Sequence, residues 1–97
     1  MDENRTVNIA IQVVPLAADA YAVVDRAIQV IMASGLKFEV GPMETTIEGP
    51  FDRAWEVARA AHLECLRAGA DRVLTYIKIL DGQAGADEMQ GRTEKYR

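Results

Sequence analysis

Cysteine is nearly absent from this chain, since Cys65 is the only one among 97 residues. One cysteine excludes an internal disulfide and any Cys-x-x-Cys metal or redox pair. Histidine is equally scarce, with His62 alone. A zinc site normally takes about four protein ligands, or three and a water, so these two residues, three apart on an expected helix, do not make one. We therefore predict no metal site within a protomer.

Long apolar runs and an excess of basic residues are also missing. No stretch approaches the roughly 18 consecutive apolar residues that a membrane span needs, and the polar start at residues 1–5 does not have the character of a secretory signal. With 11 Lys and Arg against 15 Asp and Glu, the net charge is -4, which argues against binding a phosphate backbone. There is no P-loop, dinucleotide glycine fingerprint or Gly-x-Ser-x-Gly. We expect a cytoplasmic protein that binds neither nucleic acid nor membrane, and we assign no catalytic residue.

What is present is a regular succession of two periodicities. Apolar residues alternate with others along 7–14, which predicts a strand that Pro15 should end. Spacings of three and four follow, typical of a helix capped by Asp19 and ending near Ser34. A hairpin of short strands at 36–40 and 45–49 comes next, then a helix opened by Pro50 and Asp52 and reaching about residue 68, then a strand at 72–80.

This order, strand, helix, strand, strand, helix, strand, predicts an α+β fold of the ferredoxin-like βαββαβ kind. We expect residues 1–97 to form one domain with a four-stranded antiparallel sheet and two helices on one face. We expect the polar tail at 81–97 to be loose, or ordered only by a partner subunit. The other sheet face would expose apolar side chains, which favours a homo-oligomer built partly through sheet faces. They are Ala10, Val14, Leu74, Tyr76 and Leu80.

The densest polar chemistry lies in the segment 41–49, Gly-Pro-Met-Glu-Thr-Thr-Ile-Glu-Gly. Alternation along its second strand places Thr46 and Glu48 on one face and Thr45 and Ile47 on the other. A hydroxyl beside a carboxylate could hold a cationic or amino-bearing ligand. The alternatives stay open: both threonines are good strand residues in any case, and Glu48 could be a solvated carboxylate or a cap for the second helix.

With these residues in view, most of the chain resembles the small thiamine-binding family of ferredoxin-like proteins. The specific part is Gly41-Pro42-Met43 with Thr45, Ile47, Glu48 and Gly49 in step. Weaker matches are Val14-Pro15-Leu16, Asp52, His62, Glu64, Arg72-Val73 and Lys78-Ile79. Two positions depart from the family pattern: Leu80-Asp81-Gly82 stands in place of Asp-Asp-Arg, and Glu44 stands where a small residue is usual.

The resemblance implies a non-enzymatic homo-oligomer, a tetramer built from dimers, that binds thiamine, its hydroxymethylpyrimidine half or a similar heteroaromatic compound. No cofactor is implied beyond that ligand. Such a ligand needs a polar partner for its amine, a wall for its ring and negative charge near its thiazolium. Glu48 with Thr46 could supply the polar contact. The further candidates are Thr45, Gln12, Met43, Tyr21 and His62.

Two other functions fit the same fold, because fold does not fix function. One is a small dimeric enzyme, such as a cofactor-free oxygenase or isomerase, which would need His62 or Glu48 in an apolar cleft. The other is a structural or regulatory oligomer that binds protein. The structural or regulatory oligomer is favoured if side chains fill the cleft.

Overall fold

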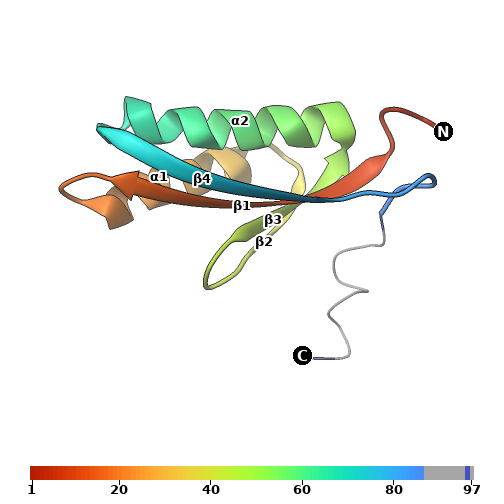
Figure 1. Cartoon of the computed structure of the whole chain (residues 1–97), viewed down its shortest axis with the longest axis horizontal. Coiled ribbons are helices and arrows are strands. Elements are labelled where there is room, and N and C mark those ends of the chain that lie inside the picture. The colour runs from red at the N-terminus through yellow and green to blue at the C-terminus, as the bar shows by residue number, and fades with distance from the viewer. Residues whose placement is uncertain (87–95, 97) are drawn as a thin grey trace.

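The computed structural model describes residues 1–86 and Tyr96, and it has the βαββαβ order (Figure 1). The sheet order is β2-β3-β1-β4, with every neighbouring pair antiparallel. Both helices cover the same face of this sheet (Figure 1). The predicted ferredoxin-like α+β fold is therefore confirmed. The bounds are β1 Thr6–Leu16, α1 Ala20–Ala33, β2 Lys37–Val40, β3 Thr45–Pro50, α2 Phe51–Arg67 and β4 Arg72–Leu80.

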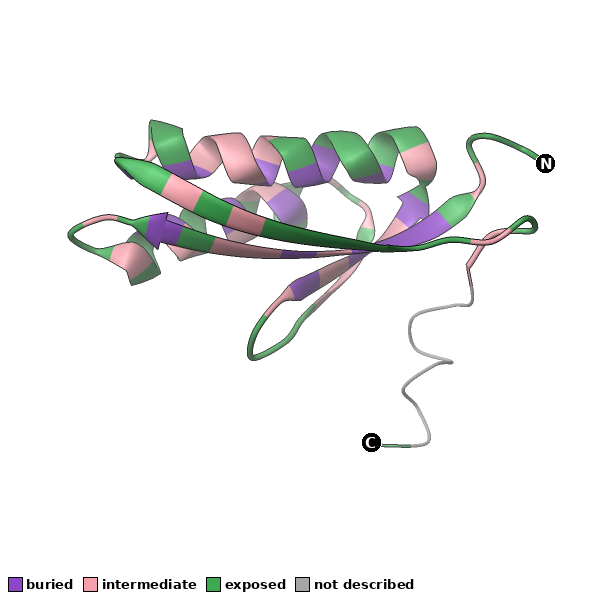
Figure 2. Cartoon of the chain, viewed as in Figure 1, coloured by how far each residue is buried: buried purple, intermediate pink, exposed green. Residues whose placement is uncertain are grey.

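The core lies between the sheet and the helices, and its pattern follows from the alternation along β1. Val7, Ile9 and Ile11 point to the helices and are buried, and Ile47 of β3 lies opposite Ile9 with no exposed surface. Helix α2 adds small side chains, among them Ala54, which let it approach the sheet closely. The buried surfaces gather on the inner sides of the layers, while β4 is largely exposed (Figure 2).

At the start of each helix, one side chain accepts a hydrogen bond from a backbone amide. For α1 this side chain is a neighbour in the sequence, and for α2 it is far away in the sequence. The Asp19 carboxylate accepts the Ala22 amide at 3.1 Å, as the sequence predicted for α1. Helix α2 begins at Phe51, and the amide of Asp52 donates to Asn4 Oδ1 at 2.9 Å. This cap comes from a residue 48 positions earlier in the chain. The remote cap was not predicted, and Glu48 is not the group that accepts from Asp52.

The first strand is longer than predicted, because it continues through Pro15 to Leu16. The carbonyl of Leu16 accepts the amide of Asp71, so Leu16 faces β4, and its neighbour Pro15 faces the opposite edge. Pairing with β3 on that edge has already ended at Ile11. The missing N–H of proline therefore removes no ladder bond, and the expectation that Pro15 ends the strand was wrong.

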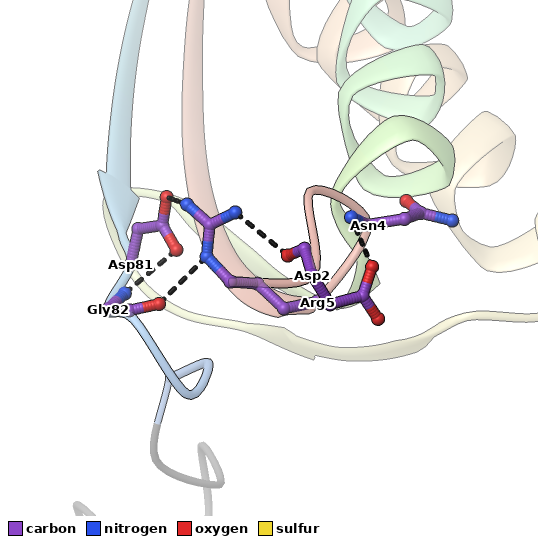
Figure 3. Close-up of polar contacts among 5 residues, drawn as sticks. All are labelled: Asp2, Asn4, Arg5, Asp81 and Gly82. Atoms are coloured by element: carbon purple, nitrogen blue, oxygen red, sulfur yellow. Dashed lines mark hydrogen bonds and ion pairs between the residues drawn. The ribbon is translucent and has the colours of Figure 1, made fainter.

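The segment after β4 is held by its own chain, contrary to the expected loose tail (Figure 3). Arg5 pairs with the carboxylate of Asp81, donates from Nε to the carbonyl of Gly82 at 2.7 Å, and lies 5.9 Å over the ring of Phe51. The amide of Ala86 donates to the carbonyl of Thr6 at 2.9 Å. These contacts order residues 81–86. The rest of that prediction concerns residues 87–95 and 97, which lie outside the described part.

Replacing Ile47 by alanine should lower the free energy of unfolding by about 2–5 kcal/mol, because a fully buried side chain leaves a cavity between β3 and the helices. Urea denaturation followed by circular dichroism measures this. The control is Met32→Ala, at a half-exposed position on α1, which should stay within about 0.5 kcal/mol of the wild type. Equal midpoints for the two variants would contradict the described core.

Candidate ligand-binding site

A cavity of about 110 Å³ lies in the notch left where β3 ends and β1 continues. Its floor is apolar and comes from α1 and the inner face of β1. Its rim is the connection between β2 and β3. The lining residues are Ile11, Gln12, Val13, Val24, Ala27, Ile28, Ile31, Gly41, Pro42, Met43, Glu44, Thr45 and Ala61. The hollow is therefore open on one side, mainly apolar and bordered by a few polar groups.

The rim is a tight turn that favours glycine at position 41. The amide of Gly41 donates to the carbonyl of Glu44 at 2.8 Å and closes the turn. A Cβ on Gly41 would lie 3.0 Å from that carbonyl oxygen, closer than most real contacts. The turn thus fixes where Met43 and Thr45 stand relative to the cavity.

The edge of β1 adds backbone polar groups to the same notch. Amide and carbonyl groups alternate in direction along a strand, so Val13, like Pro15, presents its groups to the side that β3 no longer occupies. Val13 also lines the cavity. A flat ring with a donor and an acceptor on one edge could pair there as a neighbouring strand would. Pro15 also faces this side but has no N–H. Val13 is therefore the one residue of β1 beyond Ile11 that offers both an amide and a carbonyl on this edge.

The structure places three of these predicted site residues in the cavity lining and two outside it. Thr45, Met43 and Gln12 line the cavity. Thr46 and Glu48 share the opposite, open face, as alternation predicted, with Thr46 opposite Ala10 of β1. Glu48 lies 3.7 Å from Lys37 Nζ and borders a separate, more polar hollow beside Arg5 and the segment 83–86. The five residues therefore do not form one site within a single chain.

The remaining two candidates lie away from the cavity. Tyr21 is on the first turn of α1 with 87% of its surface exposed. The Nδ1 atom of His62 lies 2.6 Å from the hydroxyl of Thr75, so this ring links α2 to β4. Neither residue lines the hollow. The ligand roles of both residues remain predictions.

Sequence reasoning missed the contribution of α1 and of Glu44. The α1 residues of the lining, such as Val24 and Ile28, carry the ordinary apolar pattern of a core helix and give no separate signal. Glu44 belongs to the rim, and its carboxylate pairs with Lys78 Nζ at 2.9 Å across the intervening β1. The signal in the sequence was that Glu44 follows Gly-Pro-Met at a position where the family pattern usually has a small residue.

Helix α2 buries the one cysteine, and this thiol is structural in character. Cys65 has no exposed surface, and desolvation by burial raises its pKa above the ordinary 9.0. Among residues 1–86 and Tyr96, no three His, Cys, Asp or Glu side chains are grouped so that they could hold a metal ion. In the same part of the chain, no helix is both long and apolar enough to cross a membrane.

The ferredoxin-like sheet therefore carries a small, partly apolar notch with a few polar groups at its border. The family model for "Thiamine-binding protein" matches residues 9–97, and the chain belongs to this family. A UPF0045 protein of Clostridium perfringens is 42% identical over 94 residues, which covers 95% of this chain and 98% of that protein.

Solved structures show the same fold at similar identity. A domain of unknown function from Bacillus cereus superposes with a TM-score of 0.90 at 41% identity, covering 97% of this chain and 92% of that one. A Thermotoga maritima protein, for which a role in thiamine biosynthesis or salvage has been suggested, gives 0.82 at 34% identity. That match covers 95% of this chain and 99% of that one.

The buried thiol makes a prediction about pH. Because burial raises the pKa of Cys65 in the folded state, the unfolded chain loses this proton first, and stability should fall as the pH rises beyond 9.0. Below that pH the contribution is fully present. Urea midpoints of the wild type and of Cys65→Ala, measured from neutral to alkaline pH, isolate the thiol from the other titrating groups. Parallel curves for the two proteins would contradict the buried, protonated thiol.

Proposed function

We propose that this protein binds thiamine, its hydroxymethylpyrimidine half or a related heteroaromatic metabolite without chemical turnover, and that the ring enters the notch between β1 and the Gly41–Thr45 rim. Membership of the thiamine-binding family and the apolar, one-sided cavity support this. The single observation that carries the placement is the end of β3 pairing at Ile11, which opens the notch. The role suggested for the Thermotoga protein agrees with it.

The size of the cavity indicates how much of such a ligand is enclosed. An apolar cavity of roughly 150 Å³ holds benzene. A hollow of about 110 Å³ that is open on one side therefore suits one six-membered ring. In thiamine the pyrimidine would occupy the notch, and the thiazolium would lie at the rim near Met43. The hydroxyl of Thr45 and the backbone edge of Val13 are the polar partners for the aminopyrimidine.

We also propose that the functional form is a homo-oligomer, a tetramer built from dimers, in which a second copy covers the open sheet face. Beyond Ile11, β1 and β4 continue as a two-stranded ribbon. The open face of this ribbon carries a patch of large apolar side chains without a carboxylate, Val14, Leu16, Leu74 and Tyr76. A twofold axis would bring this patch against itself, which buries it in both copies at once. Figure 2 shows β4 exposed along most of its length.

Titration calorimetry with thiamine and with hydroxymethylpyrimidine tests the ligand. We expect at least one to bind, and a ligand at about 100 times its dissociation constant should stabilise the fold by about 2.7 kcal/mol. Thr45→Val should weaken binding about fivefold or more, because it removes the hydroxyl and keeps the shape. Thr46→Val is the matched control on the opposite face and should bind as the wild type does.

Two outcomes would count against this placement. If neither compound binds the wild type, the proposed function is wrong. If Thr46→Val or Glu48→Gln abolishes binding while Thr45→Val does not, the site lies on the open face, where the sequence first placed it.

Replacing Tyr76 by glutamate should dissociate the oligomer, because a charge would be buried in the apolar patch. Light scattering coupled to size exclusion measures the mass of each species. Leu66→Glu places the same charge at a similarly exposed position on α2 and should leave the mass unchanged. A wild-type protein that is monomeric at micromolar concentration would contradict the proposed assembly.

A further inference from the structure

One charged pair, formed by Glu44 and Lys78, stands at the rim of the cavity. Glu44 is a lining residue, and its carboxylate lies 2.9 Å from Lys78 Nζ. The two residues come from the hairpin and from β4, with β1 between them. The Glu44 side chain is one-third exposed and that of Lys78 is 71% exposed, so solvent and salt screen their attraction.

Among the described residues, the rim carries no other ionisable side chain. Glu44 is the one charged residue in the lining, which otherwise consists of apolar residues, glycine, proline, Gln12 and Thr45. The neighbouring acids of the same sheet face, Glu39 and Glu48, are absent from the lining. Lys78 lies opposite Ala10 of β1, on the open face that also carries Thr46, so the Glu44 carboxylate reaches over β1 on this face. A ligand that extends from the notch onto the open face would meet this carboxylate.

The cavity holds one ring and leaves the next group of a ligand at this rim. We propose that Glu44 selects ligands by charge: the site prefers a heteroaromatic ring that carries a cationic group beside it, and Lys78 tunes the preference by competing for the same carboxylate. This inference rests on the proposed function and narrows its ligand class from heteroaromatic compounds in general to cationic ones. Glu44 is then a specificity-determining residue.

The competition between Lys78 and the ligand has a definite sign. With Lys78 in place, the carboxylate is partly neutralised, and a cationic ligand must share it or displace the ammonium. Removing the Glu44 charge should weaken the binding of a cation, and removing the Lys78 charge should strengthen it. A neutral ligand in the same notch should respond to neither change. Opposite shifts for the cation, with none for the neutral compound, are a pattern that misfolding cannot produce.

Thiamine and hydroxymethylpyrimidine form the matched pair of probes, because they share the pyrimidine and differ in the cationic ring. Calorimetric titrations at low salt should show thiamine affinity falling about twofold to fivefold in Glu44→Gln and rising by a similar factor in Lys78→Met. Hydroxymethylpyrimidine affinity should not change in either variant. The thiamine shifts should shrink as ionic strength increases.

Control substitutions separate a local from a general charge effect. Lys37→Met removes another cation of the same sheet face, one that pairs with Glu48 and lies outside the lining. Glu56→Gln removes an exposed acid on α2. Both should leave the ratio of thiamine to hydroxymethylpyrimidine affinity at the wild-type value, and urea denaturation should confirm that all four variants fold.

Three results would overturn the inference. Equal shifts for both probes in Glu44→Gln would show a structural role for Glu44. An unchanged ratio in both Glu44→Gln and Lys78→Met, with a wild type that binds, would show that the rim charge does not select, while the proposed function would stand. If the wild type binds neither probe, the proposed function and this inference are both wrong.

Discussion

The antiparallel pairing of β1 with partners of unequal length is the constraint on which the rest of this structure depends. On one side β1 pairs with β4 through Leu16, and on the other its pairing with β3 ends at Ile11. One half of the strand is thus in the middle of a four-stranded sheet, and the other half belongs to a two-stranded ribbon. The notch that could receive a ligand and the ribbon that could receive a second copy both arise from this one mismatch.

The same mismatch separates the chemistry of the two sheet faces. Toward the helices, the missing strand exposes α1 side chains that would otherwise lie under the sheet, so the notch has an apolar floor. Away from the helices, the charged side chains gather over β2 and β3, where Lys37 lies opposite Glu48, and the ribbon carries large apolar groups. The pair formed by Glu44 and Lys78 crosses β1 and joins the two regions.

The sequence predicts what depends on local pattern, and it fails where a contact spans the chain. Alternation placed Thr46 and Glu48 on one face correctly, and the order of periodicities was enough to predict the fold. The cap from Asn4 to α2 and the contacts of Arg5 with residues 81–82 join segments that no short window contains. The notch was missed because a strand's pairing length is set by its neighbours, so the polar segment was visible while the apolar floor beneath it was not.

Pro15 limits the binding of a peptide strand at the notch without affecting the binding of a small molecule. An open strand edge invites an extended segment from another protein to add itself as a further strand. Such a visitor could bond to Val13 but would find no amide two residues further on, so its ladder would break after one rung. The proline thus leaves too few backbone hydrogen-bonding groups on this edge for fibril growth or strand swapping. The groups of Val13 are still enough for a compound with a single hydrogen-bonding edge.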